Sequence, residues 1–224
     1  MLPKIIIGVL VVICIFVIGL FIIGNLNPDP QCPNPLIFQT PIDITKATSL
    51  LYPGQIRGGD FKPHGGFRFD NSKNDEIEVR IPIDSKFVSA SRYLEQGEVQ
   101  YLFDFELPCG IMYRFDHLLT LTPKFAEIVK DLPKPKENDS RTSGLKQKVN
   151  LTKGEIIATG VGIRRNQNVF VDFGVYDMRG KMFQGPRQNG ICWFNLLSKE
   201  DEAKIKRLPP ADSQSGSQST LCKP

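Results

Sequence analysis

Apolar and polar residues alternate along several short stretches in the middle of the chain. Alternation with a period of two is typical of strands that bury one face and expose the other. The stretches lie at 76–83, 86–90, 97–107, 110–117, 154–160 and 168–176. Turn-forming residues separate most of them, and Pro82 indicates an edge or the end of a strand. The pattern therefore predicts a mainly β protein, built as an antiparallel β-sheet or a barrel-like sandwich.

Two segments have helical spacing instead. Thr122 and Pro123 suit the cap and the first turn of a short helix whose apolar positions recur up to residue 132. Ser198 opens a second short helix, with acidic residues in its first turn and two prolines at its end. The lysine-rich segment 133–148 is expected to be an exposed loop, and residues 212–220 form a serine- and glutamine-rich tail.

The first thirty residues contain an unbroken apolar run over 5–24. Twenty helical residues, at about 1.5 Å each, span roughly 30 Å, which is the thickness of the hydrocarbon core of a bilayer. No small-residue cleavage site follows the run, which favours an uncleaved transmembrane helix over a signal peptide. Lys4 precedes the run, and the next lysine or arginine is Lys46. The positive-inside rule then predicts a single-pass protein of the cell membrane, with a cytoplasmic N-terminus and the bulk of the chain extracytoplasmic.

These patterns divide the chain of 224 residues into four parts. They are a transmembrane anchor (1–24), an extended, proline-rich linker and wrapping segment (25–57), a β domain (58–180) and a C-terminal extension with a short helix and a polar tail (181–224). The formal net charge is +4, and the 28 basic and 24 acidic residues are interspersed. A nucleic-acid-binding protein concentrates lysine and arginine on one face, so no nucleic acid is expected as a partner.

Four of the five cysteines lie outside the apolar run, at Cys32, Cys109, Cys192 and Cys222. An even set of cysteines in an exported segment is typical of disulfides. Of the three pairings that four cysteines permit, we favour Cys192 with Cys222, which would tie down the polar tail, and Cys32 with Cys109. The alternative is four buried thiols.

The chain has only two histidines, and both have neighbours that suit chemistry. His64 is followed by two glycines and then by Asp70, and His117 directly follows an aspartate. Asp172 is an unusual carboxylate in the middle of a predicted strand, and it needs a partner if it is buried. A hydrolytic zinc site has three protein ligands and one open position for water. The candidate zinc ligands are His64, Asp70 and Asp172, with His117 as the catalytic base or orienting group.

The same residues also have a structural interpretation, in which His64 caps a turn, Asp70 binds backbone amides and His117 packs against aromatic residues. No ligand pair has helical spacing, so local pattern alone favours this interpretation. Other chemistries have less support. The sequence has no serine in a nucleophile elbow, no phosphate-binding loop, and no cysteine pair with redox or zinc spacing.

The order of the motifs resembles the lysostaphin-type (LytM-like) zinc metallopeptidases. Residues 64–70 are similar to that family's first histidine-to-aspartate motif, and residues 81–90 to its proline-containing turn. Phe115-Asp116-His117-Leu118 is similar to its Tyr-x-His-Leu motif, and residues 149–160 to its Val-x-x-Gly-x-x-Ile-Gly strand. Residues 169–175 lie where its final His-x-His-Phe strand belongs. The resemblance covers residues 58–177 and implies a lysostaphin-like β fold, with His117 in the place of the second active-site histidine.

The sequence also departs from the family's motifs, as a degenerate member would. Five residues, rather than three, separate His64 from Asp70, and Phe170 and Asp172 replace the two histidines of the final strand. A set of one histidine and two carboxylates binds zinc less selectively. We therefore expect a non-catalytic binding or scaffold module of the cell envelope, whose partner is an envelope polymer or an envelope protein. The alternatives are an active zinc metallopeptidase with a His-Asp-Asp site, and a structural subunit of a membrane complex.

Overall fold

The computed structural model describes residues 30–180, 188–211 and 219–222. Residues 33–224 form one compact unit. The predicted transmembrane anchor lies outside the described residues, as does most of the polar tail. Within the described residues, no helix is both long enough and apolar enough to cross a membrane.

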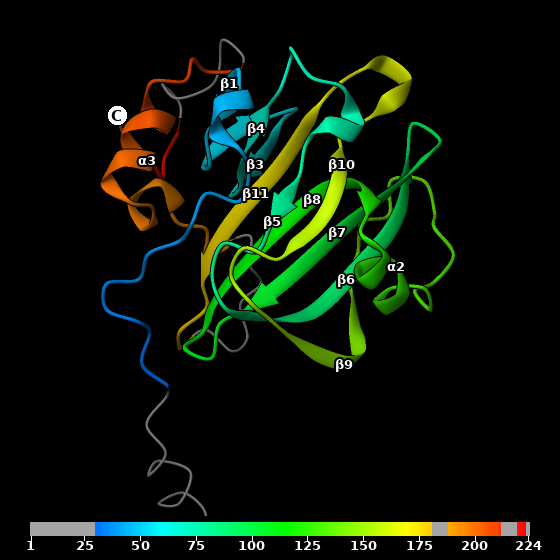
Figure 1. Cartoon of the computed structure of the whole chain (residues 1–224), viewed down its shortest axis with the longest axis horizontal. Coiled ribbons are helices and arrows are strands. Elements are labelled where there is room, and N and C mark those ends of the chain that lie inside the picture. The colour runs from blue at the N-terminus through cyan, green and yellow to red at the C-terminus, as the bar shows by residue number, and fades with distance from the viewer. Residues whose placement is uncertain (1–29, 181–187, 212–218, 223–224) are drawn as a thin grey trace, which may run out of the picture. The chain divides into compact units, whose positions relative to one another are not determined.

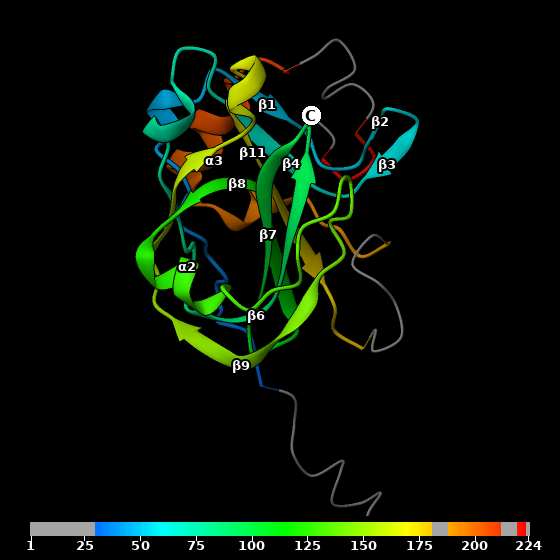
Figure 2. The same cartoon turned by 90° about the vertical axis from the view of Figure 1, so that its right-hand side faces the viewer.

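The unit is built around one large antiparallel sheet (Figures 1 and 2). The strands are β1 (Ser49–Leu51), β2 (Gln55–Arg57), β3 (Asp60–Lys62), β4 (Gly65–Arg68), β5 (Val79–Arg80), β6 (Ser85–Glu95), β7 (Glu98–Glu106), β8 (Ile111–Leu121), β9 (Ser143–Leu151), β10 (Ile156–Val161) and β11 (Phe170–Asp177). The main path of the sheet runs β1–β4–β11–β8–β7–β6–β9, and β10 pairs with both β8 and β5. Strands β2 and β3 form a separate two-stranded ribbon. This confirms the mainly β, antiparallel architecture that the alternating pattern predicts.

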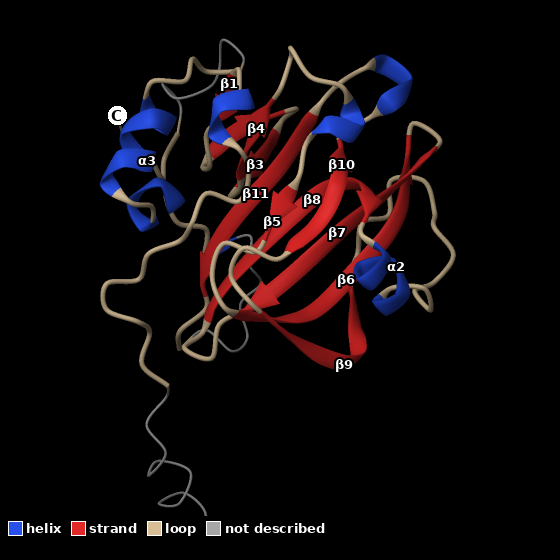
Figure 3. Cartoon of the chain, in the orientation of Figure 1, coloured by secondary structure: helices blue, strands red, loops and turns tan. Residues whose placement is uncertain are grey.

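Helices are few and short, and lie around the sheet (Figure 3). Those described are α2 (Pro123–Ile128), α3 (Lys199–Lys206) and the 3-10 turns η1 (Ile44–Lys46), η2 (Asn74–Glu76), η3 (Arg164–Asn166) and η5 (Trp193–Leu196). Both predicted α-helices are present. Pro123 occupies the first turn of α2, and the Ser198 hydroxyl caps α3 by accepting a hydrogen bond from the Asp201 N–H at 3.1 Å.

Several predicted segments differ from the observed ones, and the short strand predicted over 86–90 extends from Ser85 to Glu95 as β6. In the alternating stretch 76–83, only Val79–Arg80 form a strand, although Ile77, Val79 and Ile81 are buried as predicted. Pro82 has no N–H to donate, so the ladder cannot continue through it. The expected loop over 133–148 is wrong in its last part, because β9 begins at Ser143. Among the described strands, β9 pairs with β6 alone, and it is mostly exposed, so it needs few apolar residues and has no clear alternation.

Aromatic rings form much of the core. Phe105 stacks on Tyr113 with ring centroids 4.8 Å apart, and Phe125 of α2 packs against Phe103 at 6.1 Å. The largest fully buried side chains are Trp193, Tyr113, Tyr176, Phe38, Phe67, Phe69, Phe87, Phe103, Phe105, Phe115, Phe125 and Phe173. Because each buried aromatic ring removes a large apolar area from water, this set supplies much of the driving force for folding.

The predicted disulfide between Cys192 and Cys222 is confirmed, with a Cα–Cα distance of 5.0 Å. Cys32 and Cys109 are disulfide-bonded as well. The alternative of four buried thiols is therefore wrong.

The residues before Cys222 contact the base of the β2–β3 ribbon. The Ser219 hydroxyl donates to the Pro53 carbonyl at 2.5 Å, and the Thr220 N–H donates to the Gly54 carbonyl at 2.9 Å. These bonds join segments that are 166 residues apart in the sequence. The C-terminal segment is thereby fixed against the ribbon.

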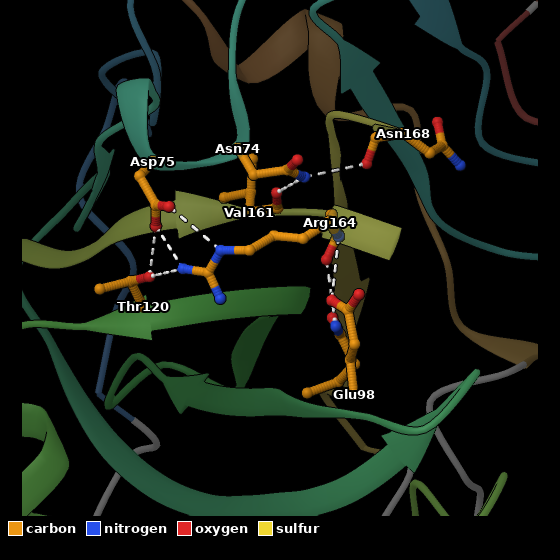
Figure 4. A network of polar contacts seen from close by, with 9 residues as sticks. Asn74, Asp75, Glu98, Thr120, Val161, Arg164 and Asn168 are labelled. Atoms are coloured by element: carbon orange, nitrogen blue, oxygen red, sulfur yellow. Dashed lines mark hydrogen bonds and ion pairs between the residues drawn. The ribbon is translucent and has the colours of Figure 1, made fainter. Parts of the chain in front are cut away.

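A network of polar contacts joins η2, β8, β10 and η3 (Figure 4). The Arg164 guanidinium donates to Asp75 at 2.5 Å and to the Thr120 hydroxyl at 2.8 Å. The Asn74 amide donates to the Val161 carbonyl at 2.7 Å, and this bond is buried. By contrast, about half of the side-chain area of Arg164 and of Asp75 is exposed, at 48% and 55%.

The burial of these two contacts predicts unequal contributions to stability. We expect Asn74→Ala to lower the free energy of unfolding by about 1–3 kcal/mol, because it removes a buried hydrogen bond. Arg164→Ala should lower it by less than about 1 kcal/mol, since water and salt screen an exposed ion pair. Urea unfolding of the full chain, followed by circular dichroism, measures both. A larger loss for Arg164→Ala than for Asn74→Ala would contradict this ranking.

Candidate functional site

Three adjacent strands bring the two histidines and one carboxylate together. The register of β4, β11 and β8 places Gly66 beside Asp172, and Asp172 beside Asp116. His64 directly precedes β4, and His117 follows Asp116 within β8. The side chains of His64, His117 and Asp172 therefore line one cleft, although the first and the last lie 108 positions apart in the sequence.

Asp172 lies between the two imidazoles. Its Oδ2 is 3.0 Å from Nε2 of His64 and 4.0 Å from Nε2 of His117, and the residue is only 8% exposed. Burial by itself raises the pKa of the Asp172 carboxyl, but the charge of His64 and the hydrogen bond from it outweigh burial. The pKa of Asp172 therefore lies well below its usual range, and the carboxylate is held ionised inside the cleft.

His117 has an unusual backbone conformation. Its φ is +61°, in the left-handed region that side chains other than glycine rarely adopt. It lies next to an irregularity in the pairing of β8 with β7, where the register shifts between Tyr101 and Phe103. Irregular pairing of this kind turns a side chain in a new direction. Here Nδ1 of His117 lies 3.3 Å from Oε2 of Glu95, and its ring centroid is 4.4 Å from that of Phe170.

Asp116 stabilises this conformation of His117. Its Oδ1 accepts a hydrogen bond from the backbone N–H of His117 at 2.8 Å and another from the hydroxyl of Tyr93 at 2.7 Å. Burial, and then the charge of Asp116, raise the pKa of the Tyr93 hydroxyl far above its usual range. The hydroxyl therefore stays protonated and remains a donor to Asp116. The Asp116 carboxylate is thus fixed by Tyr93 and in turn bonds the backbone N–H of His117.

Two glycines permit the close approach of the strands at this point. A Cβ atom on Gly66 would lie 2.5 Å from the carbonyl oxygen of Val171 and 2.8 Å from Oδ1 of Asp172. A Cβ atom on Gly174 would lie 2.8 Å from Cβ of His64. Larger side chains at either position would push His64 and Asp172 apart, so the glycines are needed for packing.

The cleft has a volume of about 420 Å³ and charges of both signs. Arg57 and Lys62 line it from the β2–β3 ribbon, and Glu95 lines it from the end of β6. The Arg57 guanidinium donates to the backbone carbonyl of His64 at 3.0 Å. The cleft is therefore polar: the ribbon contributes cations, and the sheet contributes the carboxylates of Asp172 and Glu95 together with the guanidinium of Arg114.

Asp70, the third candidate zinc ligand, lies elsewhere. It follows β4 at the opposite end of that strand from His64, and it does not line the cleft. Its carboxylate accepts hydrogen bonds from the Thr48 hydroxyl at 2.7 Å and from Arg68 at 3.2 Å, and its side chain is 53% exposed. The five residues between His64 and Asp70 include the whole of β4. Asp70 therefore lies at the far end of this strand, outside the cleft. The set of His64, Asp70 and Asp172 therefore does not come together.

Within the part of the chain that the structure describes, no group of three or more histidine, cysteine, aspartate or glutamate side chains is arranged to hold a metal ion. Because Asp70 contacts Thr48 and Arg68 while His64 contacts Asp172, the three predicted ligands do not surround one position. The residues that do surround His117 and His64 were only partly visible in the sequence. The sequence indicates Asp116 as a site residue, because it directly precedes His117. It does not indicate Glu95, Tyr93 or Arg57, because only strand pairing brings them to the cleft.

Comparisons with known proteins place few limits on this site. No family model and no curated protein sequence matches the chain. A structure of Helicobacter pylori Csd3 is similar over 77% of this chain and 40% of that one, with 12% sequence identity and a TM-score of 0.41. The chain thus spans well under half the length of that protein. A likeness of this size carries no argument about the fold or the function of this chain.

The ionised Asp172 carboxylate predicts a stability that depends on pH in the acid range. Its pKa is lower in the folded chain than in the unfolded chain, where it is about 3.9. The carboxylate therefore stabilises the fold above that pH, and its contribution is lost as the pH falls below it. We expect Asp172→Asn to lower the free energy of unfolding at pH 5 by about 1–3 kcal/mol, and this difference should shrink at pH 3 and below.

Urea unfolding of the full chain at several pH values measures this difference. Asp70→Asn is the matched control, because it makes the same chemical change at the other end of β4. Its half-exposed contacts predict a change of less than about 1 kcal/mol. An Asp172→Asn difference that stays constant from pH 5 to pH 2 would be inconsistent with an ionised carboxylate at this position.

Proposed function

We propose that residues 33–224 act as a non-catalytic binding module, with the cleft of His64, His117 and Asp172 as its binding site. In this proposal the apolar run 5–24 anchors the module in the cell membrane, the bulk of the chain is extracytoplasmic, and the partner is a polymer or a protein of the cell envelope. In this proposal the cleft corresponds to the active site of a lysostaphin-type peptidase but lacks that family's set of zinc ligands.

The placement of Asp70 is the observation that carries this proposal. A hydrolytic zinc site needs three ligands, an open position for water and a base beside it. Asp70 lies at the opposite end of β4 with Thr48 and Arg68, and His64 forms an ion pair with Asp172. Two of the three predicted ligands are thus engaged with each other, and the third is absent from the cleft.

The charges of the cleft indicate the kind of ligand. Binding sites are concave, and a few fixed polar groups orient the ligand. Arginine suits carboxylates in particular, because its planar guanidinium can donate two parallel hydrogen bonds. Arg57 and Lys62 line the same cleft as Glu95 and Asp172. Such a site fits a ligand with both carboxylate and amine or amide groups, as in the peptide-bearing polymers of a cell envelope.

The second candidate function is a zinc peptidase with His117 in place of Asp70. His64, His117 and Asp172 converge, and a carboxylate such as Glu95 beside Nδ1 is a common way to orient a zinc-binding histidine. Zinc bound there would supply an activated water. However, the chain has only two histidines, so both would be ligands and neither would remain as the base. The geometry therefore favours binding without hydrolysis.

Zinc content and ligand binding distinguish the two functions. The full chain, dialysed against zinc and then against zinc-free buffer, should retain far less than one zinc per chain and should release no product from peptides or from envelope polymer. The same preparation should sediment with insoluble envelope polymer. Arg57→Ala should weaken this binding by at least about fivefold, because it removes a guanidinium from the cleft wall.

Asp70→Asn, outside the cleft, is the control and should leave binding unchanged. Retention of one zinc per chain that is lost in His64→Ala, together with peptide hydrolysis, would establish the peptidase instead. Absence of any binding to envelope polymer by the folded chain would reject the proposed ligand class.

A further inference from the structure

Strand β9 lies at the margin of the sheet (Figures 1 and 2). Its pairing with β6 is interrupted, because Phe87 faces Val149 whereas Ser89 already faces Gly144. Residues 145–148 therefore bulge outward opposite a single residue of β6. Among the described strands, β6 is the one neighbour of β9. The outer edge of a strand presents backbone N–H and C=O groups on which an added strand can pair.

An apolar groove runs beside this edge. It has a volume of about 360 Å³ and lies between β9 and the residues at the end of α2. Ile128 and Leu132 line it on one side, and Leu145 and Val149 of β9 line it on the other. All four side chains are half-buried, so they form a recess and do not project from the surface.

The segment around the groove is strongly basic. Residues 130–153 contain seven lysines and arginines and three acidic residues, a net charge of +4. This equals the formal net charge of the whole chain, so the remaining residues are neutral in sum. Lys134 and Lys136 are exposed and form no ion pair with any residue that the structure describes. The net positive charge of the sequence therefore lies in the segment that contains β9, and within the groove itself Lys146 is paired with Asp131 at 2.9 Å.

We infer that this groove binds an extended acidic segment of a partner protein, which adds as a strand to β9 and inserts an apolar side chain between Leu132 and Leu145. The backbone of the strand edge supplies hydrogen bonds, the groove supplies specificity, and the lysines attract the acidic residues. A membrane surface fits less well, because insertion into lipid uses apolar side chains that project, and those of the groove are recessed. The inference is independent of the function proposed for the cleft.

A labelled ten-residue peptide of alternating glutamate and valine tests the inference by fluorescence anisotropy with the full chain. We expect saturable binding that weakens as salt is raised, and loss of binding for a peptide with lysine in place of glutamate. Lys134→Glu and Leu145→Asp should each weaken binding by at least about tenfold, through like-charge repulsion at the rim and in the groove. Arg207→Glu, which makes the same charge change beyond the end of α3, is the matched control and should stay within about twofold.

Hydrogen exchange provides a second measurement. Bound peptide should slow amide exchange at residues 145–148, as strand pairing requires, and should leave exchange in α3 unchanged. Absence of saturable binding at 1 mM peptide would overturn the inference, and so would equal losses for Arg207→Glu and Lys134→Glu. Binding of phosphatidylglycerol vesicles through Lys134 without binding of the peptide would also overturn it, in favour of a lipid surface.

Discussion

The register between β4, β11 and β8 is the constraint on which the rest of the cleft depends. Antiparallel pairing places Gly66, Asp172 and Asp116 side by side on three adjacent strands. A slip of one residue in β11 would turn Asp172 to the opposite face of the sheet, because side chains alternate along a strand. It would then leave both imidazoles without their shared carboxylate. The aromatic core resists such a slip, since Phe173 would have to leave its stack on Phe115.

The same constraint explains which parts of the site were predictable. A carboxylate in the middle of a strand and two histidines in glycine- and aspartate-containing motifs are visible in the sequence, and their convergence follows from strand order. Glu95 and Tyr93 carry no local signal, because they reach the cleft through the long pairing of β6 with β7. The left-handed backbone of His117 was not predictable either, since no glycine or turn motif marks it.

The fold was predictable where alternation was clear and less so where it was not. Strands β7, β8, β10 and β11 lie within a few residues of their predicted positions, because each buries one face against the core. Strand β9 was missed because it is mostly exposed and lysine-rich, and an edge strand needs only one neighbour to form. Asp70 shows a different limit. Its distance from His64 in the sequence is short, but the intervening residues are extended, and an extended segment separates its ends as far as a chain allows.

The contact between the C-terminal segment and the β2–β3 ribbon has a consequence for how the protein is made. Ser219 and Thr220 donate hydrogen bonds to the carbonyl groups of Pro53 and Gly54. Cys222, two residues after Thr220, forms the disulfide with Cys192. The ribbon that carries Arg57 and Lys62 is synthesised early, yet its base gains these partners only once residues 219 and 220, 166 positions later in the chain, have been synthesised. The described strands of the sheet all precede residue 178, whereas the base of the ribbon with Arg57 and Lys62 is completed by a segment synthesised later.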